Sequence, residues 1–179
     1  MNKKKNLKIF NMKIIFLDID GVLNYDLWYT SETYRSIMST SENFDLDIDP
    51  INAKLINSIC KKTNAKIVIT SDKRIDWNDT LMQLKRGGIN IDLIIDKTPE
   101  ILWERFRNYD EGIEVEYDCI RGNEIKRWLY THPEVKKYVI IDDILDFSDE
   151  QLPFLVKVNP HIGLTDNNIN EILKILNDE

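Results

Sequence analysis

The sequence predicts an α/β fold with a central parallel sheet. Apolar runs over residues 14–17, 65–69 and 138–141 have the composition of strands that are buried on both faces. Stretches with the apolar spacing of a helix, at 50–64 and 121–129, lie between these runs. Polar residues follow each run at the point where the strand would end. Because parallel strands end at the same edge of a sheet, we expect these polar side chains to meet there.

The remaining elements are marked by capping residues, glycine stops and further apolar runs. They are helices that begin at Asp49–Pro50, at Asn78 or Asp79 and at Thr165–Asp166, and strands over residues 92–96 and 154–158. Their order places helices between strands, as the crossovers of a parallel sheet require.

Length and composition indicate one domain. The chain has 179 residues, of which 42% are hydrophobic and 31% charged, and we expect a flexible leader over residues 1–11 followed by a single domain over 12–179. The net charge of −7 argues against general electrostatic binding of nucleic acid. No apolar run approaches the ~18 residues of a membrane span, and the start lacks a signal-peptide core, so a cytoplasmic location is expected. Cys60 and Cys119 lack metal-like spacing, which indicates reduced thiols.

Two acids close the first apolar run. Asp18 and Asp20 are two residues apart, so in extended geometry both side chains leave the strand on the same side. Like charges at this distance repel each other, and a bound cation or a proton relieves the repulsion. Gly21 then allows a sharp turn and a close approach of backbone amides to a ligand. The pattern predicts a metal and phosphate site at the mouth of the sheet.

The run K-I-I-F-L-D-I-D-G-V-L-N over residues 13–24 resembles the first motif of the haloacid dehalogenase (HAD) superfamily of Mg²⁺-dependent phosphatases. The stretch from Arg121 to Leu129, R-G-x-E-I-x-x-W-L in outline, resembles a branch of small HAD domains that includes those in nucleic-acid (RNA) repair proteins. The resemblance implies a three-layer, Rossmann-like fold with a small flap or cap insertion. The chain departs from the branch at Asp72 and Lys73, where Ser-Trp is expected, and this leaves the substrate open.

The resemblance also implies roles for four acids around a Mg²⁺ ion. Asp18 would be the nucleophile and a metal ligand, and Asp142 would complete the metal site. Asp20 would bind the metal through its backbone carbonyl and act as general acid and base. Asp143 or Asp146 would orient metal-bound water. A basic side chain in the position of the cation would contradict this interpretation.

The resemblance implies that a hydroxyl after the second strand donates to a phosphoryl oxygen. Thr70 is the expected donor, with Ser71 as the alternative. The resemblance assigns the basic residue of the third motif to Arg121, with Lys126 as the alternative. Arg74 either contacts the substrate or pairs with a neighbouring acid on the surface.

Two insertions are expected. Residues 25–48 would form a hairpin flap or cap over the site, in which Trp28, Tyr29 or Tyr34 either stacks on a flat group of the substrate or only holds the flap in place. In the first case Arg35 would lie near the phosphate. Residues 100–119 form the second insertion, which either packs on the core or contributes to the substrate mouth. His132 and His161 are expected to be structural or surface residues.

These expectations lead to one function and two alternatives. The first is a phosphomonoesterase that forms an aspartyl-phosphate and acts on a nucleotide or a nucleic-acid end. The alternatives are a phosphatase of another small metabolite and a non-catalytic protein that sequesters a phosphorylated ligand. The expected partner is therefore a phosphorylated small molecule or nucleic-acid end, with no membrane, and the oligomeric state is left open.

Overall fold

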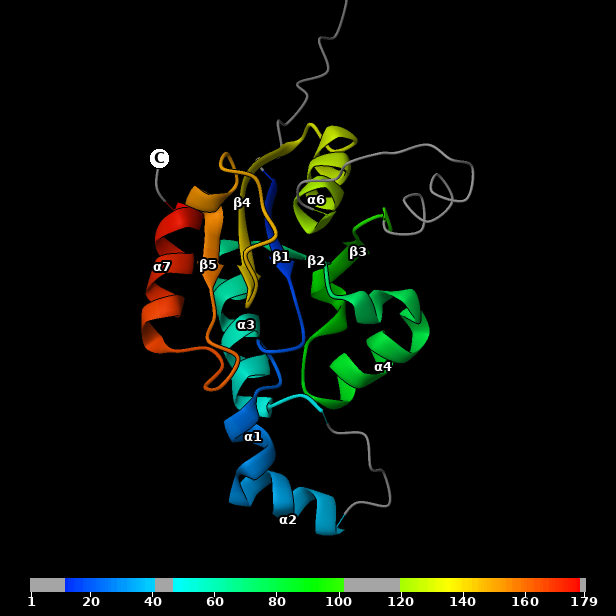
Figure 1. Ribbon diagram of the computed structural model, residues 1–179, viewed down its shortest axis with the longest axis vertical. Coiled ribbons are helices and arrows are strands. Elements are labelled where there is room, and N and C mark those ends of the chain that lie inside the picture. Colours follow the sequence, from blue (N-terminus) through cyan, green and yellow to red (C-terminus); the bar gives the residue numbers. More distant parts are fainter. Residues whose placement is uncertain (1–11, 41–46, 102–119, 178–179) are drawn as a thin grey trace, which may run out of the picture.

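A computed structural model describes residues 12–40, 47–101 and 120–177, and these residues confirm the α/β prediction (Figure 1). The strands form one all-parallel sheet in the order β3-β2-β1-β4-β5. They are β1 (Met12–Leu17), β2 (Lys66–Ile69), β3 (Ile94–Lys97), β4 (Val135–Asp142) and β5 (Leu155–Lys157). The helices are α1 (Asp26–Thr30), α2 (Glu32–Thr40), α3 (Pro50–Thr63), α4 (Trp77–Arg86), α6 (Ile120–Tyr130) and α7 (Asp166–Asn177). Short 3₁₀ turns are η1 (Asp72–Ile75), η2 (Ile91–Leu93) and η3 (Leu152–Phe154).

Helices cover both faces of the sheet, which gives three layers (Figure 1). On one face, α3, α4 and α7 contribute apolar side chains to the larger core; they are Ile56, Ile59, Leu84, Ile172 and Leu176. On the other face, Ile125 and Trp128 of α6 pack against Phe16 of β1, whose ring lies 5.5 Å from the Trp128 ring. The strands are therefore covered on both sides, as their continuous apolar composition predicts.

The strand ends are in register across the sheet. Leu17 is paired with Ile69 on β2 and with Ile141 on β4. The next residue on each strand is Asp18, Thr70 and Asp142, so three polar residues stand side by side at the carboxyl edge. The direction of the strand order reverses between β1 and β4, and open α/β sheets bind their ligands at such a switch point.

Several element boundaries differ from the prediction. Helix α4 begins after Asp76, whose carboxylate accepts the N–H of Asp79 at 3.2 Å, so the prediction of Asn78 or Asp79 as the cap was wrong. Strand β3 begins at Ile94, two residues after the predicted start at residue 92, because the Asn90 side chain caps the 3₁₀ turn η2 there. The start of α3 after Asp49 is confirmed, and Asn64 ends the helix in the left-handed conformation, with φ 59°.

The insertion after β1 is helical. Residues 25–40, called the cap below, form α1 and α2, which extend beyond the carboxyl edge of the sheet (Figure 1). The described part of the insertion is therefore a pair of helices and not a β-hairpin. Residues 41–46 lie outside the described residues, as do the expected leader over 1–11 and the part of the second insertion over 102–119 that includes Cys119. None of the helices in the described part of the chain has the length and apolar composition that crossing a bilayer requires.

Candidate active site

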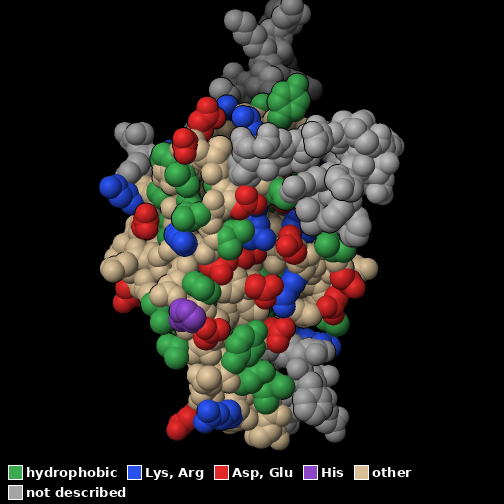
Figure 2. Space-filling view, in the orientation of Figure 1, with side chains coloured by type: hydrophobic (Ala, Val, Ile, Leu, Met, Phe, Trp, Pro, Cys, Tyr) green, Lys and Arg blue, Asp and Glu red, His purple; other side chains and the backbone are tan. Residues whose placement is uncertain are grey.

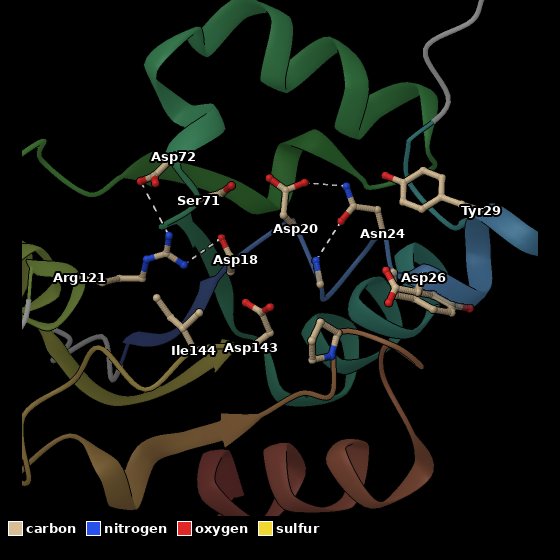
Figure 3. A pocket seen from close by; sticks show the side chains of 13 residues that line it. Asp18, Asp20, Asn24, Asp26, Tyr29, Ser71, Asp72, Arg121, Asp143 and Ile144 are labelled. Carbon is tan, nitrogen blue, oxygen red and sulfur yellow. Dashed lines mark hydrogen bonds and ion pairs between the residues drawn. The ribbon is translucent and has the colours of Figure 1, made fainter.

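A cavity of about 350 Å³ opens at the carboxyl edge of the sheet. Acidic side chains gather in the middle of the face that Figure 2 shows, with apolar side chains among them. The cavity is lined by the turns after β1 and β2, the start of α6, the loops after β4 and β5, and the cap (Figure 3). The lining residues are Asp18, Asp20, Gly21, Asn24, Ser71, Asp72, Arg121, Asp143, Ile144 and Pro160, with Tyr25, Asp26 and Tyr29 from the cap.

Three carboxylates converge at this edge. Asp18, Asp142 and Asp143, called the carboxylate cluster below, each offer an oxygen within 4.8 Å of the others. Burial and the neighbouring Asp142 raise the pKa of Asp18 to about 7, although Arg121 opposes the shift. Burial likewise raises the pKa of Asp142 and of Asp143. Ionisation of the cluster is therefore costly without a cation, and hard carboxylate oxygens are the donors that Mg²⁺ prefers.

Arg121 reaches the cluster from the first turn of α6. Its Nη1 lies 3.2 Å from Asp18 Oδ1 and donates to Asp142 Oδ2 at 2.8 Å. Burial lowers the pKa of Arg121, but the two carboxylates outweigh it and raise the pKa above its usual value. Arg121 Nη1 therefore bridges Asp18 and Asp142, two of the carboxylates expected to hold the ion, so a basic side chain lies where the metal interpretation expected none. A divalent cation at the cluster would compete with Arg121 for these two carboxylates. Lys126, the alternative, is exposed on α6.

Asp20 lies on another wall of the cavity, held by Asn24 and Lys73, whose contacts with it were not predicted from the sequence. Asn24 Nδ2 donates to Asp20 Oδ1 at 2.7 Å, and Asn24 Oδ1 accepts the Gly21 N–H at 3.0 Å. Lys73 Nζ lies 3.3 Å from Asp20 Oδ1 and 3.3 Å from Asp47 Oδ2. Burial lowers the pKa of Lys73, but the two carboxylates raise it by more, so the net pKa lies above its usual value. Lys73 therefore carries its charge beside Asp20.

The turn after β2 brings Ser71 to the cavity and leaves Thr70 behind it. Thr70 is fully buried, and among the described residues its Oγ1 has no hydrogen-bond partner. Ser71 lines the cavity, and its Oγ accepts the Lys73 N–H at 3.4 Å. The structure therefore brings the hydroxyl of Ser71 to the cavity, and not the hydroxyl of Thr70, which was the expected donor.

Arg74 points away from the cavity. Its guanidinium is buried and pairs with Glu124 of α6, with Nη2 and Oε2 2.6 Å apart. The alternative in which Arg74 pairs with a neighbouring acid on the surface is found, since Arg74 also pairs with exposed Asp72, and buried Glu124 is a second partner. Asp72 joins the two arginines, since its Oδ1 lies 3.2 Å from Arg74 Nη1 and 3.7 Å from Arg121 Nη2. In Figure 3 the Arg121 guanidinium lies between Asp72 and Asp18.

Comparison with known proteins places the chain in a family. The sequence model described as "HAD domain in Swiss Army Knife RNA repair proteins" matches residues 14–169, which is most of the chain. The chain belongs to this family. No curated protein and no solved structure matches it.

The cap of this HAD domain contributes two aromatic residues to the cavity lining, Tyr25 and Tyr29. Trp28 is buried within the cap, with its ring 5.5 Å from that of Tyr34. Arg35 is exposed on α2 and is not among the described residues that line the cavity. Asp26, which the sequence did not indicate, lines the cavity and pairs with His161.

Asp146 has a structural contact in the HAD domain. Its two carboxylate oxygens accept the N–H groups of Ile120 and Arg121, at 3.2 and 2.9 Å. These are the first amides of α6, so Asp146 caps the helix that carries Arg121. Of the two acids expected to orient metal-bound water, only Asp143 lies in the cluster.

His132 stacks on Trp128, with ring centroids 3.7 Å apart, away from the carboxyl ends of the strands.

Proposed function

We propose that this HAD domain is a Mg²⁺-dependent phosphomonoesterase that acts on the terminal phosphate of a nucleotide or nucleic acid. The observation that supports it most directly is the carboxylate cluster at the switch point, with Arg121 beside it. Asp18, Asp142 and Asp143 would hold the ion, together with the backbone carbonyl of Asp20. When bound, Mg²⁺ favours the ionised form of Asp18 and neutralises charge on the phosphate.

The residues of the chain divide the chemistry between them. Asp18 attacks phosphorus to form an aspartyl-phosphate while the bond to the leaving oxygen breaks. Asp20 gives a proton to that oxygen and then accepts one from the water that hydrolyses the intermediate, a role typically worth ~10²–10⁴ in rate. Arg121 and Ser71 stabilise negative charge on the phosphoryl oxygens. Asn24 and Lys73 hold Asp20 at the wall of the cavity.

The nucleic-acid part of the proposal is supported by the family, whose description names RNA repair proteins. Tyr29 adds to this support, because an aromatic ring at the cavity offers a surface on which a base stacks. A small-metabolite phosphatase is the second candidate. It is favoured by the acidic lining, since Asp26 and Asp72 would repel additional phosphates of a long chain.

Turnover of p-nitrophenyl phosphate with MgCl₂ and with EDTA tests catalysis. We expect Asp18→Asn to lower kcat by about 10⁴-fold or more, because it removes the nucleophile. Asp92→Asn, at an exposed carboxylate far from the cavity, is the matched control and should retain full turnover. An Asp18→Asn protein with unchanged turnover would contradict the nucleophile assignment. Oligonucleotides with 3′- or 5′-phosphates, mononucleotides and sugar phosphates, compared by kcat/KM, then separate the two candidates.

A further inference from the structure

Arg74 is the largest fully buried side chain among the described residues, and it lies directly behind the turn after β2. Its Nη1 donates to the carbonyl oxygens of Thr70, at 2.8 Å, and Ser71, at 3.0 Å. Its Nε donates to the carbonyl of Thr98 at 3.2 Å, and its Nη2 to Glu124 at 2.6 Å. The planar guanidinium of Arg74 thus joins the ends of β2 and β3 to helix α6.

Contacts to these two carbonyls determine where the following N–H groups point. In a trans peptide the C=O and the next N–H are antiparallel, and the described residues contain no cis peptide. Because the Thr70 and Ser71 carbonyls face Arg74, the N–H groups of Ser71 and Asp72 point away from it. Ser71 and Asp72 are the residues of this turn that line the cavity. Within the described part of the chain neither N–H has an acceptor, and consecutive amides of this kind bind anions.

Glu124 links this turn to Arg121. It lies three residues after Arg121 in α6, so both side chains leave the same face of the helix. Its Oε2 accepts from Arg74, and its Oε1 accepts the Ile101 N–H at 3.1 Å. Both carboxylate oxygens are therefore occupied, and the pair sets the position of the turn relative to the guanidinium of Arg121.

We propose that Arg74 and Glu124 form a buried positioning pair that aims the N–H groups of Ser71 and Asp72 at a phosphoryl oxygen. Neither side chain touches the ligand, and they act through the two amides and through Arg121. The inference rests on the proposed function in one respect, namely that phosphate is the ligand of the cavity. Lysine could not replace Arg74, because its single ammonium cannot span two carbonyls and a carboxylate as the fork does.

Arg74→Lys tests the pair, with Arg86→Lys, at an exposed arginine of α4, as the matched control. We measure kcat and KM for p-nitrophenyl phosphate, the Kd for inorganic phosphate, and the rise in melting temperature that MgCl₂ causes. Loss of preorganised donors to an oxyanion costs about 10²–10³ in kcat, so we expect about a 10²-fold fall for Arg74→Lys. Phosphate affinity should weaken, whereas the effect of MgCl₂ should change much less than kcat, because the pair reaches the carboxylate cluster only through Arg121. A merely structural role would lower the melting temperature and the active fraction, and hence the apparent kcat, while KM and the phosphate Kd of the folded molecules stay at the wild-type level.

Glu124→Gln keeps the test decisive if Arg74→Lys does not fold. This change keeps the volume of the side chain and leaves Arg74 on the carbonyls of Thr70, Ser71 and Thr98, so the variant should fold. Because the charge that holds the Arg74 guanidinium is lost, kcat and phosphate affinity should fall in the same direction as in Arg74→Lys, by about 10-fold. Folded variants with kcat within about twofold of an active wild type would overturn the positioning role and leave the proposed function intact. A wild-type protein that binds but does not hydrolyse phosphate would refute catalysis alone, and weaker phosphate binding by Arg74→Lys would still support the pair. A wild-type protein that neither hydrolyses nor binds phosphate would overturn both proposals.

Discussion

At Gly21 the backbone has a φ of +76°, and an added Cβ would lie 2.5 Å from Asp143 Oδ2. Gly21→Ala therefore strains the backbone, at a cost of about 1–2 kcal/mol in the free energy of unfolding, and pushes Asp143 out of the carboxylate cluster. Gly88→Ala is the matched control, since Gly88 has a φ of +98° but its nearest neighbour would be Ala53 Cβ at 3.9 Å. In urea unfolding with EDTA both variants should lose stability. Only Gly21→Ala should also lose the stabilisation that MgCl₂ provides, and a normal Mg²⁺ response there would contradict the place of Asp143 in the metal site.

Asp18 makes stability depend on pH. Burial and Asp142 raise its pKa from 3.8 to about 7, so between these values the folded state binds more protons than the unfolded chain. The free energy of unfolding should therefore fall as pH rises from about 4 to about 7. Mg²⁺ binds the ionised carboxylates, so its stabilising effect should be larger at about pH 8 than at about pH 5.

Thermal unfolding of wild type and Asp18→Asn, with EDTA and with MgCl₂ at both pH values, checks this pH dependence. Asp18→Asn should flatten the slope measured in EDTA, and Asp92→Asn should retain it. An equal Mg²⁺ effect at both pH values would argue against a metal site built on these carboxylates.

The joint between the cap and α3 depends on Asp49. Its buried carboxylate accepts the Ile51 N–H at 2.8 Å, which caps α3, and the Tyr25 hydroxyl at 2.6 Å. Burial and this carboxylate raise the pKa of Tyr25. Asp76→Ala removes only the cap of α4. Asp49→Ala should lower the free energy of unfolding by ~1.5–3 kcal/mol more than Asp76→Ala does, because it also removes a hydrogen bond to a charged group.

A double-mutant cycle isolates the bond between the cap and α3. Tyr25→Phe should destabilise the wild type, as measured by chemical denaturation, and have little further effect in Asp49→Ala. Additive losses would show that the hydroxyl and the carboxylate do not interact.

Sequence patterns predicted elements best where they are local. The apolar runs and the Asp49–Pro50 start specify β1, β2 and α3 because each depends on neighbouring residues alone. The start of α4 was misplaced because Asp76, Asn78 and Asp79 are all capable caps, and the turn η1 before them decides which one is used. The form of the cap was also left open, since aromatic and polar residues without periodicity suit a hairpin and a helix pair equally.

At the scale of the whole molecule, charge limits how the proposed nucleic-acid substrate would be held. The net charge is −7 and the cavity lining is rich in aspartate, so binding should depend on the terminal phosphate and not on the backbone. Between about 50 and 200 mM NaCl we expect kcat/KM for a phosphorylated oligonucleotide to fall by less than ~10-fold, against ~10³–10⁵ in affinity for a protein with 6–10 phosphate contacts. A mononucleotide measured in parallel corrects for salt effects on Mg²⁺. A steep loss confined to the oligonucleotide would show that the backbone is bound as well.

The site was predictable where strand ends carry it, and less so where contacts are made through space. The convergence of Asp18 and Asp142 follows from parallel strands in one sheet, whatever separates them in sequence. The contacts of Asn24 and Lys73 with Asp20 depend on turn conformations that have no sequence period. The role of Arg74 was ambiguous in the sequence, because a charged residue beside a motif can either bind the substrate or form an ion pair. Only its burial in the structure distinguishes the two roles.

The pairing of β1 with β4 has a consequence for how the protein is made. Asp142 is translated well after Asp18, so a nascent chain lacks the complete carboxylate cluster until both segments have been made. Contacts between distant parts of a chain also form slowly. Any capture of Mg²⁺ by the cluster should therefore follow the pairing of β1 with β4, and it should distinguish chains in which this pairing has formed from chains in which it has not.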